Sequence, residues 1–180
     1  TYTTPILGDY DFDSKITYND LWDLVENWEM KNFNYELGPV SGQVPHFISI
    51  PDSKFDIEDG MAFVQIWSWY QKEYGQIVED TVMIGKPLNI AQLGNKLSIF
   101  IDDSIASGQI QFSNNHIDSR LRFSTKSYDG AMYLSHQNPE KGYSILEFAR
   151  PKSMAKDTIH VTADEESKLK IYYKFYGRDK

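Results

Sequence analysis

The 180-residue sequence contains no cysteine, which excludes disulfide bonds, cysteine zinc sites and thiol catalysis. It has no apolar run of about eighteen residues, so no transmembrane helix is expected. Glycine-rich phosphate loops and a Gly-x-Ser-x-Gly nucleophile motif are also missing. The four histidines are too far apart in sequence for a local zinc pair, and we interpret them as scattered surface residues: His46, His116, His136 and His160.

Basic residues are scarce in the first part of the chain. Residues 1–72 contain four lysines and no arginine against twelve acidic residues, a net charge of −8, whereas residues 73–180 contain fourteen of each sign. Nucleic acids require a basic binding face, so we expect no nucleic-acid partner. The change in charge near residue 72 favours two modules. The first residue is Thr, which suggests a processed product or a piece of a larger protein.

The most informative stretch is the acidic segment from Asp9 to Asp20. Its acids alternate at positions 9, 11 and 13, and three carboxylates so close together repel one another unless a cation lies among them. A twelve-residue calcium loop takes oxygens from its first, third, fifth, seventh, ninth and twelfth positions. The predicted Ca²⁺ ligands are the side chains of Asp9, Asp11, Asp13, Thr17 and Asp20 and the backbone carbonyl of Lys15.

A helix is predicted directly after this loop, over residues 18–31. Leu21, Leu24, Val25 and Trp28 have the spacing of one buried helical face. Residues 32–49 contain Gly38, Pro39, Gly42 and Pro45, and this composition predicts an irregular connector.

A second, weaker copy of the loop and helix follows at an offset of 39 residues. It predicts a possible second metal site at Asp52, Lys54, Asp56 and Asp59. Ile48 and Ile50 occupy the positions of Asp9 and Asp11, which leaves three outcomes open: weak binding, ligands borrowed from the connector, or no metal. Ser14 and Ser53 stand where such loops usually have glycine, and a positive φ there costs a serine about 1 kcal/mol. We expect Trp28 and Trp67 to meet in a shared core.

Residues 7–28, with the partial copy at 49–70, resemble the repeat of type I dockerins. The resemblance covers residues 5–72 and implies a small all-α domain of duplicated EF-hand-type calcium loops and helices. It further implies an extracellular protein that needs Ca²⁺ to fold and docks onto a cohesin-like module of another protein or of the same one.

The rest of the chain has the pattern of a β-protein. Short alternating runs are separated by glycine and asparagine turns, which is typical of an antiparallel β-sandwich, immunoglobulin-like or cohesin-like, over residues 73–180. The expected strands are 77–84, 87–91, 97–101, 109–112, 120–124, 131–134, 143–148, 158–163 and 168–176.

Other candidate sites are weaker. Ser135 and His136 are neighbours on an expected strand, so their side chains point to opposite faces and do not form a catalytic pair. Asp102, Asp103 and Glu147 could form a glycosidase carboxylate pair, but we favour a charged turn and a strand-edge acid. A sugar-stacking platform could use aromatic residues, although packing is the simpler role: Trp69, Tyr70, Tyr128 and Tyr133.

The fold predicted from the sequence is therefore α+β, with an all-α calcium module over 1–72 and a β-sandwich over 73–180. The predicted function is a non-enzymatic, extracellular or cell-surface calcium-binding module that attaches to a protein partner within a larger assembly. Three alternatives remain: a carbohydrate-binding module of a polysaccharide-degrading enzyme, a small glycan-cleaving enzyme, and a structural spacer or surface-layer piece. No membrane insertion is expected.

Overall fold

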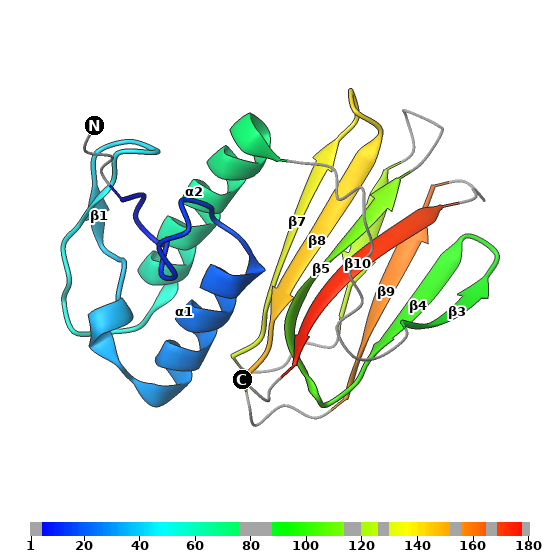
Figure 1. The fold of residues 1–180 in the computed structure, drawn as a ribbon, viewed down its shortest axis with the longest axis horizontal. Coiled ribbons are helices and arrows are strands. Elements are labelled where there is room, and N and C mark those ends of the chain that lie inside the picture. The colour runs from blue at the N-terminus through cyan, green and yellow to red at the C-terminus, as the bar shows by residue number, and fades with distance from the viewer. Residues whose placement is uncertain are drawn as a thin grey trace. The chain divides into compact units, whose positions relative to one another are not determined.

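The computed structural model describes residues 5–75, 88–113, 120–125, 130–151, 156–164 and 169–177 (Figure 1). The chain divides into two compact units, residues 1–76 and 77–180. The sequence placed this boundary after residue 72. None of the described helices is both long and apolar enough to cross a membrane.

The first unit contains two α-helices, α1 (Tyr18–Met30) and α2 (Ile57–Tyr74). Between them lie a short 3₁₀ helix, η1 (Phe33–Tyr35), and an antiparallel ribbon of β1 (Val40–Ser41) and β2 (Ile48–Ser49). Apolar side chains from both helices and from the segments before them are fully buried: Ile16, Leu21, Leu24, Phe63 and Ile66.

Both helices begin with the same capping device. The N-cap side chain of Thr17 accepts from the first turn of α1, while Asp20, three residues later, accepts from the Thr17 amide. Asp56 and Asp59 form the equivalent capping box on α2. Such reciprocal bonds satisfy amides that a helix start otherwise leaves without a partner, so they fix where each helix begins.

The predicted fold class was wrong for the first unit. The described chain is mainly antiparallel β, with ten strands in three sheets and only two α-helices, and no small all-α module is evident. The connector expected to be irregular forms η1 and the β1–β2 ribbon, because Gly42 turns the chain with φ of 92° and lets Val40 pair with Ser49. No duplicated dockerin-type domain is evident in the described part of the chain, so that resemblance was also wrong.

The tryptophan prediction holds for one of its two residues. Trp67 is 2% exposed and belongs to the core, whereas Trp28 is half-buried and stacks on Phe55 with ring centroids 5.4 Å apart. Phe33 of η1 stacks on the same Phe55 ring. The connector therefore supplies a second aromatic neighbour of Phe55 beside Trp28.

The second unit packs two four-stranded antiparallel sheets around one core. One sheet has the order β10-β5-β8-β7 and the other β3-β4-β9-β6. Their bounds are β3 (Asn89–Leu93), β4 (Lys96–Ile101), β5 (Ile105–Ser113), β6 (Leu121–Ser124), β7 (Met132–Asn138), β8 (Tyr143–Ala149), β9 (Asp157–Ala163) and β10 (Lys170–Gly177). Buried side chains from both sheets form the core, among them Ile99, Ile110, Phe112, Phe148 and Ile159.

Eight of the nine expected strands coincide with these strands, because alternation of apolar and polar residues reports a sheet with one buried face. On β4, for example, Leu97, Ile99 and Ile101 are buried while Lys96 and Phe100 are exposed. The remaining expected strand, 77–84, lies outside the described residues.

Candidate metal site

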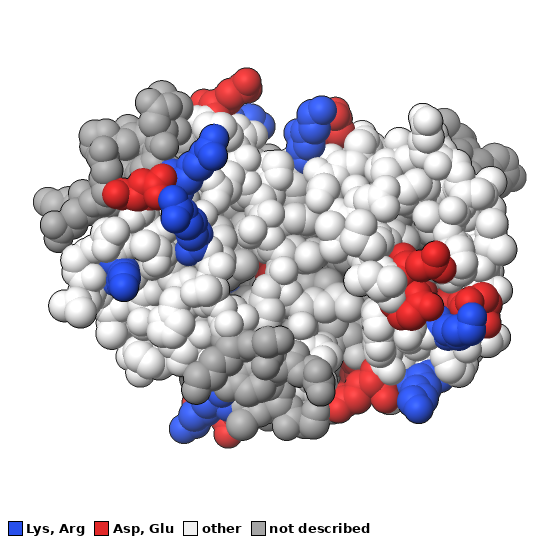
Figure 2. Space-filling view, turned by 180° about the vertical axis from the view of Figure 1, so that it is seen from behind, with Lys and Arg blue, Asp and Glu red and all other residues white. Residues whose placement is uncertain are grey.

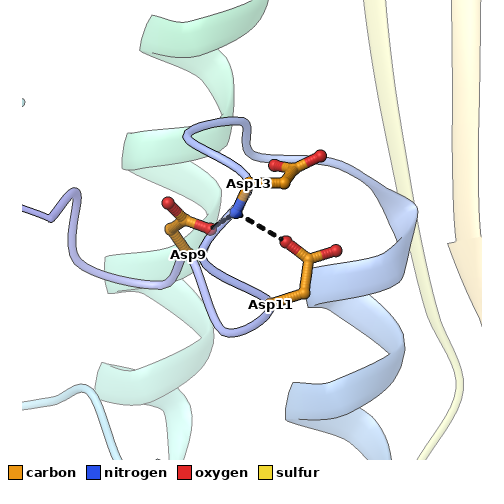
Figure 3. Close-up of side chains that lie close together, drawn as sticks. All are labelled: Asp9, Asp11 and Asp13. Carbon is orange, nitrogen blue, oxygen red and sulfur yellow. Dashed lines mark hydrogen bonds between the residues drawn. The ribbon is translucent and has the colours of Figure 1, made fainter.

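Three carboxylates converge in the loop ahead of α1 (Figure 3). One oxygen from each of Asp9, Asp11 and Asp13 lies within 4.8 Å of the others. Asp9 is buried, whereas Asp11 and Asp13 are exposed, so the cluster has a protein side and a solvent side.

The loop is folded by these same carboxylates. Asp9 accepts hydrogen bonds from the amides of Asp13 at 3.2 Å and Ser14 at 3.0 Å, and Asp11 accepts from the Asp13 amide at 3.1 Å. Phe12 and Ser14 have φ of 58° and 65°, which bends the chain tightly enough to bring the acids together. The positive φ predicted for Ser14 and Ser53 is confirmed, since Ser53 has φ of 62°.

The loop is also anchored to α2. A Cβ added to Gly8 would lie 3.5 Å from the Phe63 ring, so the chain enters the loop in contact with the core. Burial raises the pKa of the Asp9 carboxyl; the Ser14 amide opposes this shift, and the charges of Asp13 and Asp11 add to it. A bound cation would favour the ionised form of all three carboxylates.

The other predicted ligands have different neighbours. Asp20 is fully buried, and its two oxygens accept from the Tyr10 and Thr17 amides, both at 2.8 Å. Burial raises the pKa of Asp20 to about 7, although these two amide bonds lower it. Thr17 is the N-cap of α1, and the Lys15 amide donates to Asp13 at 2.8 Å. Asp20 and Thr17 therefore fix the helix start that follows the loop.

The second predicted loop does not gather its acids. Among the described residues, only the Asp9, Asp11 and Asp13 group has metal-ligand spacing. The Asp52 carboxylate instead bonds the ammonium group of Lys54 at 2.6 Å, and this bond lowers the pKa of Asp52. Asp56 caps α2, and the buried Asp59 accepts from the Leu37 and Gly38 amides, each at 2.8 Å.

Sequence reasoning missed the residue that organises this second loop, Glu36. Its carboxylate accepts hydrogen bonds from the amides of Asp52 and Ser53. Those amides correspond, at the offset of 39 residues, to the Asp13 and Ser14 amides that Asp9 accepts. The signal that could have identified Glu36 is its isolation, since it is the only acidic residue between residues 30 and 51.

The minor candidates do not assemble into sites. Glu147 is fully buried on a central strand rather than at a strand edge, and it accepts from Gln109 at 2.8 Å. Asp102 accepts from the Ser104 amide and hydroxyl, as a charged turn would.

The described members of the aromatic platform have packing partners within their own units. Tyr133 packs against the sandwich core and donates to Asp157, while Trp69 and Tyr70 contact each other and Tyr74 on α2. Tyr128 and His116 lie outside the described residues.

No family model matches the chain, and neither a curated protein nor a solved structure matches it. Function is therefore argued from the geometry of the described residues.

Proposed function

We propose that the first unit is a non-enzymatic calcium-binding module, with Ca²⁺ held by Asp9, Asp11 and Asp13. The observation that carries this proposal is the 4.8 Å grouping of three carboxylate oxygens in a loop whose backbone bends to bring them together. Ca²⁺ prefers oxygen ligands and accepts flexible geometry, so backbone carbonyls and water complete its shell.

Calcium would act on the fold through the helix that follows. The loop starts at Gly8, in contact with Phe63 of α2, and ends at Thr17, the N-cap of α1. Neutralising the acids relieves their repulsion and orders the segment between these two anchors. Bound Ca²⁺ therefore stabilises the first unit, in line with a structural ion.

Attachment to a protein partner is supported by exposed apolar side chains of the first unit. Ile57 and Met61 lie one turn apart on α2 and are 73% and 50% exposed, and Ile48 of β2 is 66% exposed. Contiguous exposed apolar patches are typical of interaction sites, and Ile57 and Met61 are neighbours on one face of α2. On the side seen in Figure 2, charged side chains gather in small groups of both signs, which suits a protein partner better than a phosphate backbone.

An extracellular or cell-surface location follows from the chemistry proposed for the site. Two of the three acids are exposed, and open calcium sites of extracellular modules bind with Kd values of about 10⁻⁴–10⁻³ M. Calcium at that level is available outside cells. A structural spacer would share this site but would bind no soluble partner.

The test is calorimetric titration of the whole chain with CaCl₂ after chelator treatment. We expect one site, loss of the binding heat in Asp11→Ala, and unchanged binding in Asp103→Ala, which removes an exposed acid from the second unit. Saturation at about 100 times Kd should add about 2.7 kcal/mol to the free energy of unfolding. No binding heat, together with identical melting in CaCl₂ and EDTA, would refute the proposal.

A further inference from the structure

One face of the β3-β4-β9-β6 sheet is turned away from the sandwich core. On β4, Leu97, Ile99 and Ile101 point into the core, so Lys96, Ser98 and Phe100 belong to the opposite face. We call this opposite face the outer sheet face.

Strand register arranges the outer sheet face in three rows across the strands. Neighbouring rows are two residues apart along each strand, or about 7 Å. The rows are Asn89, Phe100 and Thr158; Ala91, Ser98, His160 and Ser124; and Leu93, Lys96, Thr162 and Arg122.

Two cavities border these rows. One, of about 550 Å³, opens at the end of the sandwich and is lined by the whole first row, by Asp102, Lys156 and Asp157, and by four side chains in or against the core: Leu88, Ile101, Ile105 and Phe175. The other, of about 470 Å³, is lined by the whole second row and by Leu93, Lys96 and Thr162 of the third. The first cavity borders the first row, and the second cavity borders the second and third rows. Together they span about 14 Å along the strands.

Five of the eleven side chains in these rows are short, uncharged hydrogen-bonding groups: Asn89, Ser98, Ser124, Thr158 and Thr162. Phe100 is 43% exposed, and its strand neighbours across the sheet are Asn89 and Thr158. In the next row, the Ser98 hydroxyl and His160 Nδ1 lie 3.0 Å apart, and their hydrogen bond orients the imidazole at the cavity. The Phe100 ring suits a ligand that has apolar C–H faces. The polar side chains beside it and in the next row suit a ligand that carries many hydroxyl groups.

Charge on the outer sheet face argues against an anionic polymer. The rows contain two basic side chains, Arg122 and Lys96. Arg122 forms an ion pair with Asp164 at 3.1 Å, whereas Lys96 has no ion pair among the described contacts. Phosphate recognition requires a denser set of cations. The rows contain no Trp or Tyr, and their two exposed large apolar side chains, Phe100 and Leu93, lie in different rows and do not form the central anchor cluster of a protein interface.

We propose that the outer sheet face binds a linear, uncharged glycan, with a sugar ring stacked on Phe100 and hydroxyl groups bonded to the neighbouring rows. This site belongs to the second unit and does not depend on the calcium proposed for the first.

The experiment titrates the whole chain with cellohexaose, xylohexaose and laminarihexaose, each in CaCl₂ and in EDTA. We expect binding of at least one hexasaccharide, with the same Kd in both buffers. Phe100→Ala should weaken that binding at least tenfold, and Ser98→Trp, which fills the second cavity, should abolish it. The matched control is Phe33→Ala, which removes a ring of 42% exposure from the first unit and should leave binding unchanged.

Three results would overturn the assignment. One is the absence of binding by all three hexasaccharides at millimolar concentration. Another is binding that survives both Phe100→Ala and Ser98→Trp. The third is preferential binding of hexagalacturonate that disappears in 0.5 M NaCl, which would make the ligand an anion. If the chain binds a glycan but does not bind Ca²⁺, only the calcium function proposed for the first unit is refuted.

Discussion

Replacing Asp59 by alanine should strongly destabilise the first unit. The Asp59 carboxylate is 1% exposed and accepts from three backbone amides, each at 2.8 Å: Leu37 and Gly38 in the connector and Asp56 at the start of α2. The Asp59→Ala change leaves all three without an acceptor. It therefore disconnects the connector from the helix and removes half of the capping box.

The cost can be estimated from the two fully buried bonds. A buried amide left unpaired costs about 1–3 kcal/mol, so the Leu37 and Gly38 amides together account for about 2–6 kcal/mol. The Asp56 amide adds less, because its bond is only partly buried and water can replace the acceptor. A small domain has about 5–15 kcal/mol of stability in total, so Asp59→Ala removes a large share of it.

The assay is urea unfolding followed by tryptophan fluorescence. All four tryptophans, Trp22, Trp28, Trp67 and Trp69, lie in the first unit, so their fluorescence reports that unit alone. The expected loss lowers the urea midpoint by about 2–4 M, while Asp59→Asn, which keeps one acceptor oxygen, should lie between wild type and Asp59→Ala.

The matched control is Glu58→Ala, which removes an exposed acid from the same helical turn. It should cost only the small electrostatic contribution of an acid near a helix N-terminus, about 0.5 kcal/mol. An Asp59→Ala midpoint within about 0.5 M of the Glu58→Ala midpoint would refute the role assigned to Asp59.

Three further predictions concern the same unit and use the same fluorescence assay. Burial raises the pKa of Asp20 to about 7, whereas the unfolded carboxyl titrates near 4, so in EDTA the unfolding free energy should fall as pH rises from about 4 to 7. Asp20→Asn should reduce that slope, leaving the share that comes from the raised pKa of Asp9, and an equal slope in the variant would contradict the assignment. Gly38→Ala would place a Cβ 2.6 Å from the Glu58 carbonyl carbon and should destabilise the first unit by about 1–3 kcal/mol. A urea midpoint equal to that of the wild type would show that the connector shifts at no cost to make room for the methyl group. Ser14→Gly and Ser53→Gly should each stabilise the unit by a few tenths to 1 kcal/mol by relieving a positive φ, and a loss of stability in both would argue against backbone strain there.

Sequence periodicity predicted the second unit well because its signal is local. Alternation along β4 follows directly from one face packing on the core, and β9 alternates in the same way. The central strand β8 is buried at every position, and its prediction came from a short apolar run between turn residues. Alternation could not predict the strand register that places Phe100 between Asn89 and Thr158. These two residues are 11 and 58 positions away in sequence, and packing and turns determine that they pair with Phe100.

The first unit was predicted less well because its decisive contacts are not local. The acidic alternation at Asp9, Asp11 and Asp13 led to the loop geometry, and the helix after it followed from the apolar spacing of residues 21–28. The offset of 39 residues suggested a second calcium loop, but the equivalent carboxylate comes from Glu36, sixteen residues before Asp52. A search for regular loop spacing cannot find a group that reaches its site through the folded connector.

The capping carboxylates have a consequence for how the first unit opens. Asp20 joins the first turn of α1 to the Tyr10 amide, and Asp59 joins the first turn of α2 to the Leu37 and Gly38 amides. Neither helix can fray from its amino end without releasing peptide groups 10 or 21–22 residues earlier in the chain. In deuterium exchange, the Tyr10, Leu37 and Gly38 amides should therefore acquire label together with their helices, as two cooperative opening units rather than as independent turns.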